Sequence, residues 1–145
     1  MKTGKPKILI IDDSKNIRKL IKVVLRDKDY DFAEASNGLE ALDKVKIENP
    51  DLVVLDMVIP GMNGIEVCKA IKGDPRTKHV RIIILTSETT LEARELSHQA
   101  GADVFMLKPF EPKDLRSAVK ELLSGRLDDC MQNIEKIWTD IYNDN

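Results

Sequence analysis

The segment KILIIDD, residues 7–13, sets a pattern that the rest of the chain repeats. After Lys7 come four apolar residues in a row, a short run that is typical of a strand buried on both faces of a sheet. The run ends at Asp12 and Asp13, and apolar residues then recur at helical spacing over 17–25. Ser14 stands where an N-cap would begin that helix. The segment and its surroundings therefore predict a buried strand, an acidic end and an amphipathic helix, in that order.

Four further units repeat this order along the chain. Strands are expected at about 31–35, 52–55, 81–85 and 104–107. Helices are expected from 39 to a stop at Asn49-Pro50, and at about 65–72, 91–100 and 112–123. Asn37-Gly38 is expected to form a turn. Strict alternation of strands and helices predicts a doubly wound α/β fold, a five-stranded parallel sheet with helices on both faces.

The composition favours one domain with a well-solvated surface. Of the 145 residues, 42% are apolar and 33% are charged, which supplies one packed core and argues against disorder. The formal net charge is −2 with both signs interspersed and no basic patch, so we expect no direct nucleic-acid binding. No apolar run approaches the roughly 20 residues that cross a bilayer, so we expect no membrane contact. Two cysteines, Cys68 and Cys130, are too few for a disulfide framework, which favours a cytoplasmic protein.

Polar side chains mark the ends of four of the expected strands. They are Asp12, Asp13, Asp56, Thr86 and Lys108. Right-handed crossovers place the C-terminal ends of all parallel strands along one edge, where open sheets of this kind bind their ligands. Each residue alone is an ordinary cap or turn residue, but together they predict one site.

The residue types at this edge indicate phosphoryl chemistry with a metal ion. Three carboxylates in one place repel one another unless positive charge joins them, and Lys108 supplies only one such charge. Because only oxygen ligands are available, Mg²⁺, or Mn²⁺ in its place, fits the site and zinc does not. Asp56 is the natural nucleophile, since carboxylates form acyl phosphates. Lys108 would then hold one phosphoryl oxygen, and the Thr86 hydroxyl would donate to another.

Four short motifs together resemble the two-component response-regulator receiver family, which includes the single-domain chemotaxis-type regulators. They are Asp12-Asp13, DMVIPGMNG at 56–64, LTS at 85–87 and KPF at 108–110. The resemblance spans about residues 7–123, nearly the whole chain. It implies a flavodoxin-like strand order 2-1-3-4-5 within a receiver domain at 1–124.

The resemblance also implies a phosphorylation site and a metal site. Asp56 would accept a phosphoryl group from a phosphohistidine on a sensor histidine kinase or a phosphotransfer protein. Asp13 and Asp56 would bind Mg²⁺ directly. Val58 would bind it through its backbone carbonyl, and Asp12 through a water molecule. The protein would be a phospho-acceptor switch rather than an enzyme, although it would assist its own phosphorylation and dephosphorylation.

A conformational switch is implied as well. Lys108 would contact the phosphoryl group and precede a cis peptide bond at Pro109. Thr86 and Phe105 would form the switch pair, in which the hydroxyl moves to the phosphate and the ring fills the vacated space. Many relatives have tyrosine at the position of Phe105, so we expect a bias towards the buried ring here. A downstream protein, which the sequence does not identify, would bind the face formed by residues 91–100, 104–108 and 113–123.

Beyond the receiver, residues 125–145 are expected to form a C-terminal helical extension or linker. Apolar residues recur at 127, 130, 134, 137 and 141, a seam of only about two heptads. Three interpretations fit it: a helix folded back onto its own domain, a homodimer through residues 126–145, or a linker to an output domain.

Two interpretations of the whole chain share the same chemistry. It is a single-domain binding module that depends on phosphorylation, or it is the receiver portion of a larger regulator or hybrid kinase. A phosphatase of the haloacid dehalogenase type is disfavoured, because its general acid would stand at Val58. A flavin mononucleotide binder is disfavoured as well, because Asp12-Asp13 would repel its phosphate. A degenerate receiver would lack a key residue, and none is missing.

Overall fold

The computed structural model describes residues 4–26 and 28–124, in which strands and helices alternate from one end to the other. The strands are β1 (Lys7–Ile11), β2 (Asp31–Ala35), β3 (Leu52–Leu55), β4 (Arg81–Thr86) and β5 (Val104–Leu107). The helices are α1 (Lys15–Leu25), α2 (Gly38–Glu48), α3 (Gly64–Gly73), α4 (Leu91–Gln99) and α5 (Pro112–Leu123). The extension expected at 125–145 lies outside the described residues, and so does the segment 126–145 for which a homodimer was one of three interpretations.

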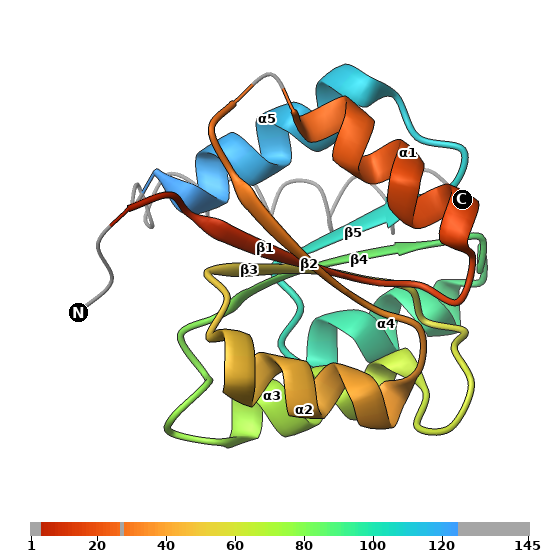
Figure 1. The fold of residues 1–145 in the computed structure, drawn as a ribbon. Coiled ribbons are helices and arrows are strands. Elements are labelled where there is room, and N and C mark those ends of the chain that lie inside the picture. Colours follow the sequence, from red (N-terminus) through yellow and green to blue (C-terminus); the bar gives the residue numbers. More distant parts are fainter. Residues whose placement is uncertain (1–3, 27, 125–145) are drawn as a thin grey trace.

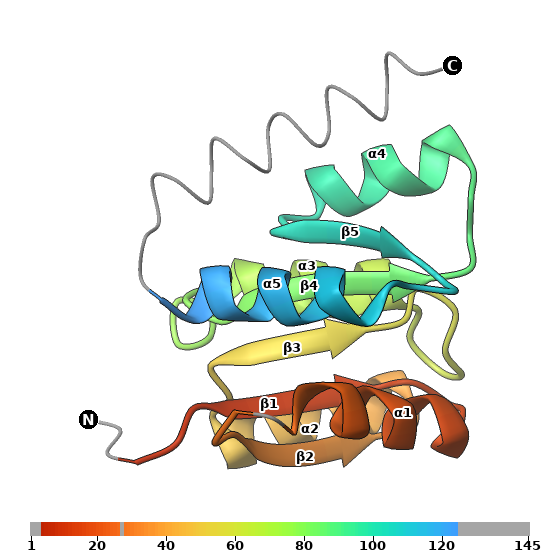
Figure 2. The same ribbon diagram turned by 90° about the horizontal axis from the view of Figure 1, so that it is seen from above.

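All five strands are parallel and lie in the order β2-β1-β3-β4-β5, as expected. Helices α1 and α5 cover one face of the sheet, and α2, α3 and α4 cover the other (Figure 1). Seen from above, β2 and β5 form the two edges of the sheet, and β3 lies at its centre (Figure 2). The doubly wound architecture predicted from the sequence is confirmed. Among the helices of the described ranges, none combines the length and apolar composition that crossing a membrane requires.

The core lies along the three inner strands. The side chains of Ile8–Ile11, Leu52–Leu55 and Ile82–Leu85 are at most 1% exposed. Helices on both faces exclude water from these strands, and each buried aliphatic side chain stabilises the fold by about 1.5–3 kcal/mol. In β2, at the edge, only Ala35 is fully buried. This position at the edge of the sheet explains why the apolar pattern of residues 31–35 is weaker than that of the inner strands.

The start of α2 differs from the sequence prediction. Asn37-Gly38 was expected to form a turn, but Asn37 is an N-cap and Gly38 is already the first residue of the helix. The Asn37 side chain accepts a hydrogen bond from the Glu40 backbone N–H at 2.9 Å, which replaces the missing intrahelical partner. A Cβ atom on Gly38 would lie 2.6 Å from Cβ of Met62, so glycine is required here by close packing rather than by a turn. The N-cap predicted at Ser14 is confirmed, because its side chain accepts from Ile17 N–H.

Gly64, the first residue of α3, packs directly against the backbone that follows β3. A Cβ atom built on it would overlap the backbone carbonyl of Asp56 and lie 2.6 Å from Cα of Met57. The Gly64 N–H donates to the Met57 carbonyl at 2.9 Å. The helix start and the end of the central strand are therefore held together without an intervening side chain.

We predict that Gly64→Ala lowers the free energy of unfolding by about 1–3 kcal/mol, because the neighbouring backbone has no room to move aside. Urea denaturation followed by circular dichroism measures the change. Gly73→Ala is the matched control, since a Cβ there meets nothing within 4 Å. Equal destabilisation by the two variants would contradict the packing argument.

Candidate functional site

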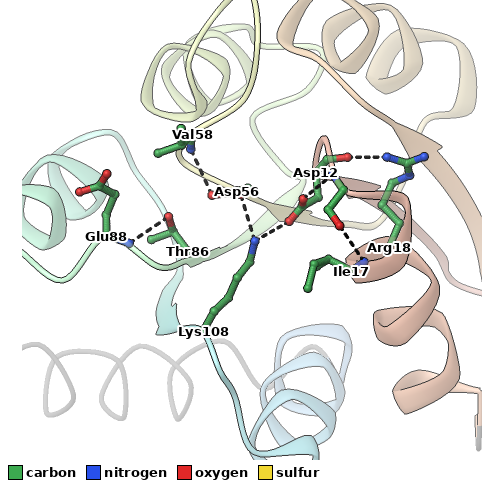
Figure 3. Close-up of polar contacts among 9 residues, drawn as sticks. Asp12, Ile17, Arg18, Asp56, Val58, Thr86, Glu88 and Lys108 are labelled. Atoms are coloured by element: carbon green, nitrogen blue, oxygen red, sulfur yellow. Dashed lines mark hydrogen bonds and ion pairs between the residues drawn. The ribbon is translucent and has the colours of Figure 1, made fainter.

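The ammonium group of Lys108 joins the ends of three strands. Lys108 follows β5, and its Nζ donates to Asp12 Oδ2 at 2.7 Å and to Asp56 Oδ2 at 3.0 Å (Figure 3). Ile11 and Leu55 are partners in the β1–β3 pairing, so Asp12 and Asp56 follow neighbouring strands at the same level. Both carboxylates are buried, 2% and 8% exposed, which makes a paired charge necessary. The convergence predicted for these three residues is confirmed.

A third carboxylate completes an acidic cluster. Asp13 is exposed, and one carboxylate oxygen each from Asp12, Asp13 and Asp56 lie within 4.8 Å of one another. Three carboxylates with one ammonium leave a formal charge of −2, which one divalent cation would neutralise. An all-oxygen donor set is what the hard cations Mg²⁺ and Mn²⁺ prefer. The residues present therefore fit such an ion.

Lys108 stays charged in this environment. Burial by itself would lower the pKa of its ammonium, but the hydrogen bonds that it donates to Asp12 and Asp56, together with their negative charges, raise that pKa above its usual value. The group is therefore a permanent cation near neutral pH. The peptide bond to Pro109 is cis, as expected. Lys108 N–H also donates to the Thr86 carbonyl at 2.9 Å, which holds the start of this segment against β4.

Asp56 is held by both of its side-chain oxygens. Oδ2 accepts from Lys108, and Oδ1 accepts from the backbone N–H of Val58 at 3.1 Å. The Val58 side chain is 55% exposed beside the carboxylate. What the structure shows for Val58 is this N–H contact, and its backbone carbonyl as a metal ligand stays a prediction.

Thr86 and Phe105 lie beside the cluster rather than in it. The Thr86 side chain is fully buried, and its Oγ1 accepts from the backbone N–H of Glu88 at 3.3 Å (Figure 3). Phe105 lies on β5 opposite Ile84, with only 5% of its surface exposed. The ring is thus buried, and the Thr86 hydroxyl is bonded to the loop that follows β4. The switch role of this pair stays a prediction.

A basic and acidic network behind the cluster was not predicted from the sequence. Arg18 on α1 donates through Nη1 to the backbone carbonyl of Asp12 at 2.6 Å, and through Nε to Glu34 Oε1 at 2.9 Å. Lys22 donates to the other oxygen of Glu34 at 2.8 Å. Arg18 therefore fixes the peptide that joins Asp12 to Asp13. The spacing of four between Arg18 and Lys22 predicts that they lie on one face of the helix. Glu34 reaches them because β2 pairs with β1, and the sequence does not show that pairing.

Residues 8–120 match the family model described as the response regulator receiver domain. The chain belongs to this family. Every motif that suggested the resemblance lies within the matched residues. Receiver domains generally hold Mg²⁺ at an acidic pocket, and here the pocket is formed by Asp12, Asp13 and Asp56.

Known receivers resemble this one in sequence and in structure. It is 44% identical over 117 residues to sporulation initiation phosphotransferase F of Bacillus subtilis, which covers 81% of this chain and 93% of that protein. It is 37% identical over 129 residues to the DNA-binding response regulator MtrA of Mycolicibacterium smegmatis, covering 89% of this chain and 55% of that one. The chain thus spans about half the length of the MtrA proteins that it matches. The crystal structure of the chemotaxis response regulator CheY4 of Vibrio cholerae superposes with a TM-score of 0.75 at 32% identity, covering 82% of this chain and 99% of that chain.

We predict that Glu34→Gln destabilises the receiver at neutral pH but not in acid. The hydrogen bond from Lys22, together with Arg18, holds the pKa of Glu34 below its ordinary value of 4.5. A lowered pKa contributes stability above pH 4.5 that is lost as the pH falls through the folded pKa. Because Glu34 is about a third exposed, the loss should stay below about 1 kcal/mol.

Urea denaturation at neutral pH and below pH 4.5 measures this difference. The matched control is Glu92→Gln, on the exposed surface of α4. A deficit that persists unchanged in acid would mean that Glu34 acts by packing rather than by charge.

We predict that Lys108→Met binds Mg²⁺ about tenfold more tightly, because the ammonium competes with the ion for the same two carboxylates. Calorimetric titration of the unphosphorylated protein with MgCl₂ measures the affinity. Lys69→Met, an exposed residue of α3, is the control with the same charge change. Weaker binding by Lys108→Met would show that the ammonium organises the carboxylates more than it competes for them.

Proposed function

We propose that this receiver takes a phosphoryl group onto Asp56 and thereby changes what it binds. The observation that supports the proposal is the position of Asp56, whose Oδ2 shares the Lys108 ammonium with Asp12 while Asp13 completes the cluster. The Asp56 carboxylate is therefore buried, oriented and paired with a cation before any phosphoryl donor arrives. The proposal rests on that geometry and on family membership.

The chemical step is a transfer between two nucleophiles. An oxygen of the Asp56 carboxylate attacks phosphorus of a phosphohistidine, and a new O–P bond forms as the N–P bond breaks. The electron pair of the broken bond returns to the imidazole nitrogen, which leaves as neutral histidine after taking up a proton. Hydrolysis reverses the state, because water attacks phosphorus and releases inorganic phosphate with Asp56 restored. The product is an acyl phosphate.

The neighbouring side chains have defined roles in this proposal. Lys108 moves its hydrogen bond from Asp56 Oδ2 to a phosphoryl oxygen, which keeps the cation paired throughout. The Thr86 hydroxyl, which accepts from Glu88 N–H in this structure, donates its own proton to a second phosphoryl oxygen. The Phe105 ring stays buried and fills the space that Thr86 leaves.

The metal ion would be held by carboxylates that other contacts already orient. Asp13 and Asp56 would hold it directly, Asp12 through water, and Val58 through its backbone carbonyl. Both oxygens of Asp12 already accept hydrogen bonds, from Ser14 N–H at 2.9 Å and from Lys108, which favours the indirect role. Mg²⁺, or Mn²⁺ in its place, supplies positive charge to the attacking oxygen and the incoming phosphoryl group when it is bound.

Receiver domains work with histidine kinases or phosphotransfer proteins, and we propose such a donor here. A downstream protein would bind the face of α4, β5 and α5, with no direct nucleic-acid contact from the receiver itself. In this proposal the chain is a switch rather than an enzyme, and it lies in the cytoplasm. The relative MtrA is a DNA-binding response regulator. MtrA is longer than this chain, which supports the alternative proposal that this receiver belongs to a larger regulator or hybrid kinase.

Incubation with acetyl phosphate and Mg²⁺ tests the proposal. Intact mass spectrometry is expected to show one added phosphoryl group on the native chain. Neither Asp56→Asn nor the native chain in chelator should gain it. The matched control is Asp103→Asn, which should still be phosphorylated. Asp103 is buried and pairs with Ile82 at the start of β4, whereas the cluster lies at the opposite ends of the strands.

If the native chain shows no adduct, its binding of beryllofluoride is measured next, because fast hydrolysis would hide the phosphorylated form. Saturable binding that depends on Mg²⁺ and on Asp56 supports the proposal. Failure of both reagents would overturn it and leave a receiver that binds its partner constitutively.

A further inference from the structure

The two faces of the sheet carry very different charge. Helices α1 and α5 together hold seven lysines and arginines and two carboxylates, a net charge of +5 in a chain whose formal net charge is −2. Helices α2, α3 and α4 hold five cationic and six acidic residues, a net charge of −1. No basic run marks this face in the sequence, because its cations come from two segments about 90 residues apart. It forms only when α1 and α5 pack side by side (Figures 1 and 2).

A cavity of about 180 Å³ lies within this basic layer. Four cationic side chains line it: Lys28 from the segment after α1, and Lys113, Arg116 and Lys120 from α5. The three residues on α5 are spaced three and four apart, so they form a single stripe on the helix. Leu25, which is buried, and Tyr30, which is half-buried, supply an apolar wall.

The four cations of this cavity lack partners within the part of the chain that the structure describes. None of them forms an ion pair or a side-chain hydrogen bond with another residue of 4–26 or 28–124. Cations nearby on α1 behave differently, since Arg18 and Lys22 both pair with Glu34. Four unpaired cations around one small concavity repel one another, and a bound anion would relieve that repulsion.

We propose that this cavity between α1 and α5 binds a compact phosphate-bearing anion of the diphosphate type. Two linked phosphates bring about three negative charges within the reach of all four side chains. The wall of Leu25 and Tyr30 lies where the organic part of a phosphate ester would pack. A free diphosphate and a nucleoside diphosphate share this chemistry and differ only in whether they use the apolar wall.

The size of the cavity favours a compact anion over an acidic peptide. Neighbouring carboxylates on a peptide helix stand about 5–6 Å apart and carry one charge each. Only one such carboxylate would enter a cavity of about 180 Å³, and it would leave most of the four cations unpaired. A diphosphate places its charge in a single small volume.

The cavity lies apart from the acidic cluster, and the test uses this separation to distinguish binding at the two places. We would titrate the full, ¹⁵N-labelled chain with sodium pyrophosphate in EDTA, so that no metal recruits phosphate to Asp56. Saturable shifts of backbone amides at 28–30 and 113–120, with a Kd below about 1 mM, are expected. Amides at 56–58 and 86–88 should stay unchanged. A parallel titration with ADP shows whether the apolar wall contributes, because tighter binding than pyrophosphate requires contact with the nucleoside.

Charge-matched variants decide whether the cavity itself is the site. Arg116→Gln with Lys120→Gln should raise the Kd by about tenfold or more. Lys44→Gln with Lys46→Gln on α2 removes the same charge and should leave the Kd within about twofold.

Three results with pyrophosphate would overturn the proposal, and a fourth comes from a peptide competitor. They are a lack of saturation, equal weakening by both double variants, and shifts confined to the acidic cluster. A hexaglutamate peptide that saturates the same amides at a lower concentration than pyrophosphate would also overturn it, in favour of an acidic protein segment. Because EDTA is present and Asp56 is not involved, failure here leaves the phosphorylation proposal unaffected.

Discussion

The pairing of one lysine with two buried aspartates is the constraint on which the rest of this receiver depends. Lys108 follows an edge strand, and its ammonium passes the end of β4 to reach carboxylates after β3 and β1. Two carboxylates about 4 Å apart repel each other by roughly 1–4 kcal/mol, depending on the effective dielectric. The Lys108 ammonium offsets this repulsion by pairing with both carboxylates. The strand order and the close packing of Gly64 place the charges at this spacing.

Most of the fold could be predicted from the sequence, because burial on both faces leaves a strong pattern. The isoleucines of β1 and β4 could be assigned without knowing their partners, since continuous apolar runs of that length suit only inner strands. The prediction of a turn at Asn37-Gly38 was wrong for a local reason. The same dipeptide suits a turn or a helix N-cap, and only the packing of Gly38 against Met62 separates the two.

The features of the site also differ in whether the sequence could predict them. Topology alone predicts that the five residues at the strand ends lie at one edge of the sheet, because the C-terminal ends of parallel strands meet there. Four of them form the cluster, and Thr86 lies beside it. The contact of Arg18 with the Asp12 carbonyl could not be predicted, because it depends on the rotamer of a long side chain and on Glu34 arriving from the edge strand. The same holds for the bond between Thr86 and Glu88 N–H, which depends on the path of a loop. The basic layer was missed because net charge along a sequence does not report which helices share a face.

The sequence separation of the central ion pair has a consequence for the newborn chain. Lys108 lies 96 residues after Asp12 and 52 after Asp56, so every carboxylate of the cluster is synthesised before its counter-charge. A partly translated chain that ends before β5 does not yet contain the lysine that pairs with Asp12 and Asp56. Its central strands gain less from packing until the last strand arrives. Translation order thus tends to delay closure of this edge until nearly the whole domain has left the ribosome.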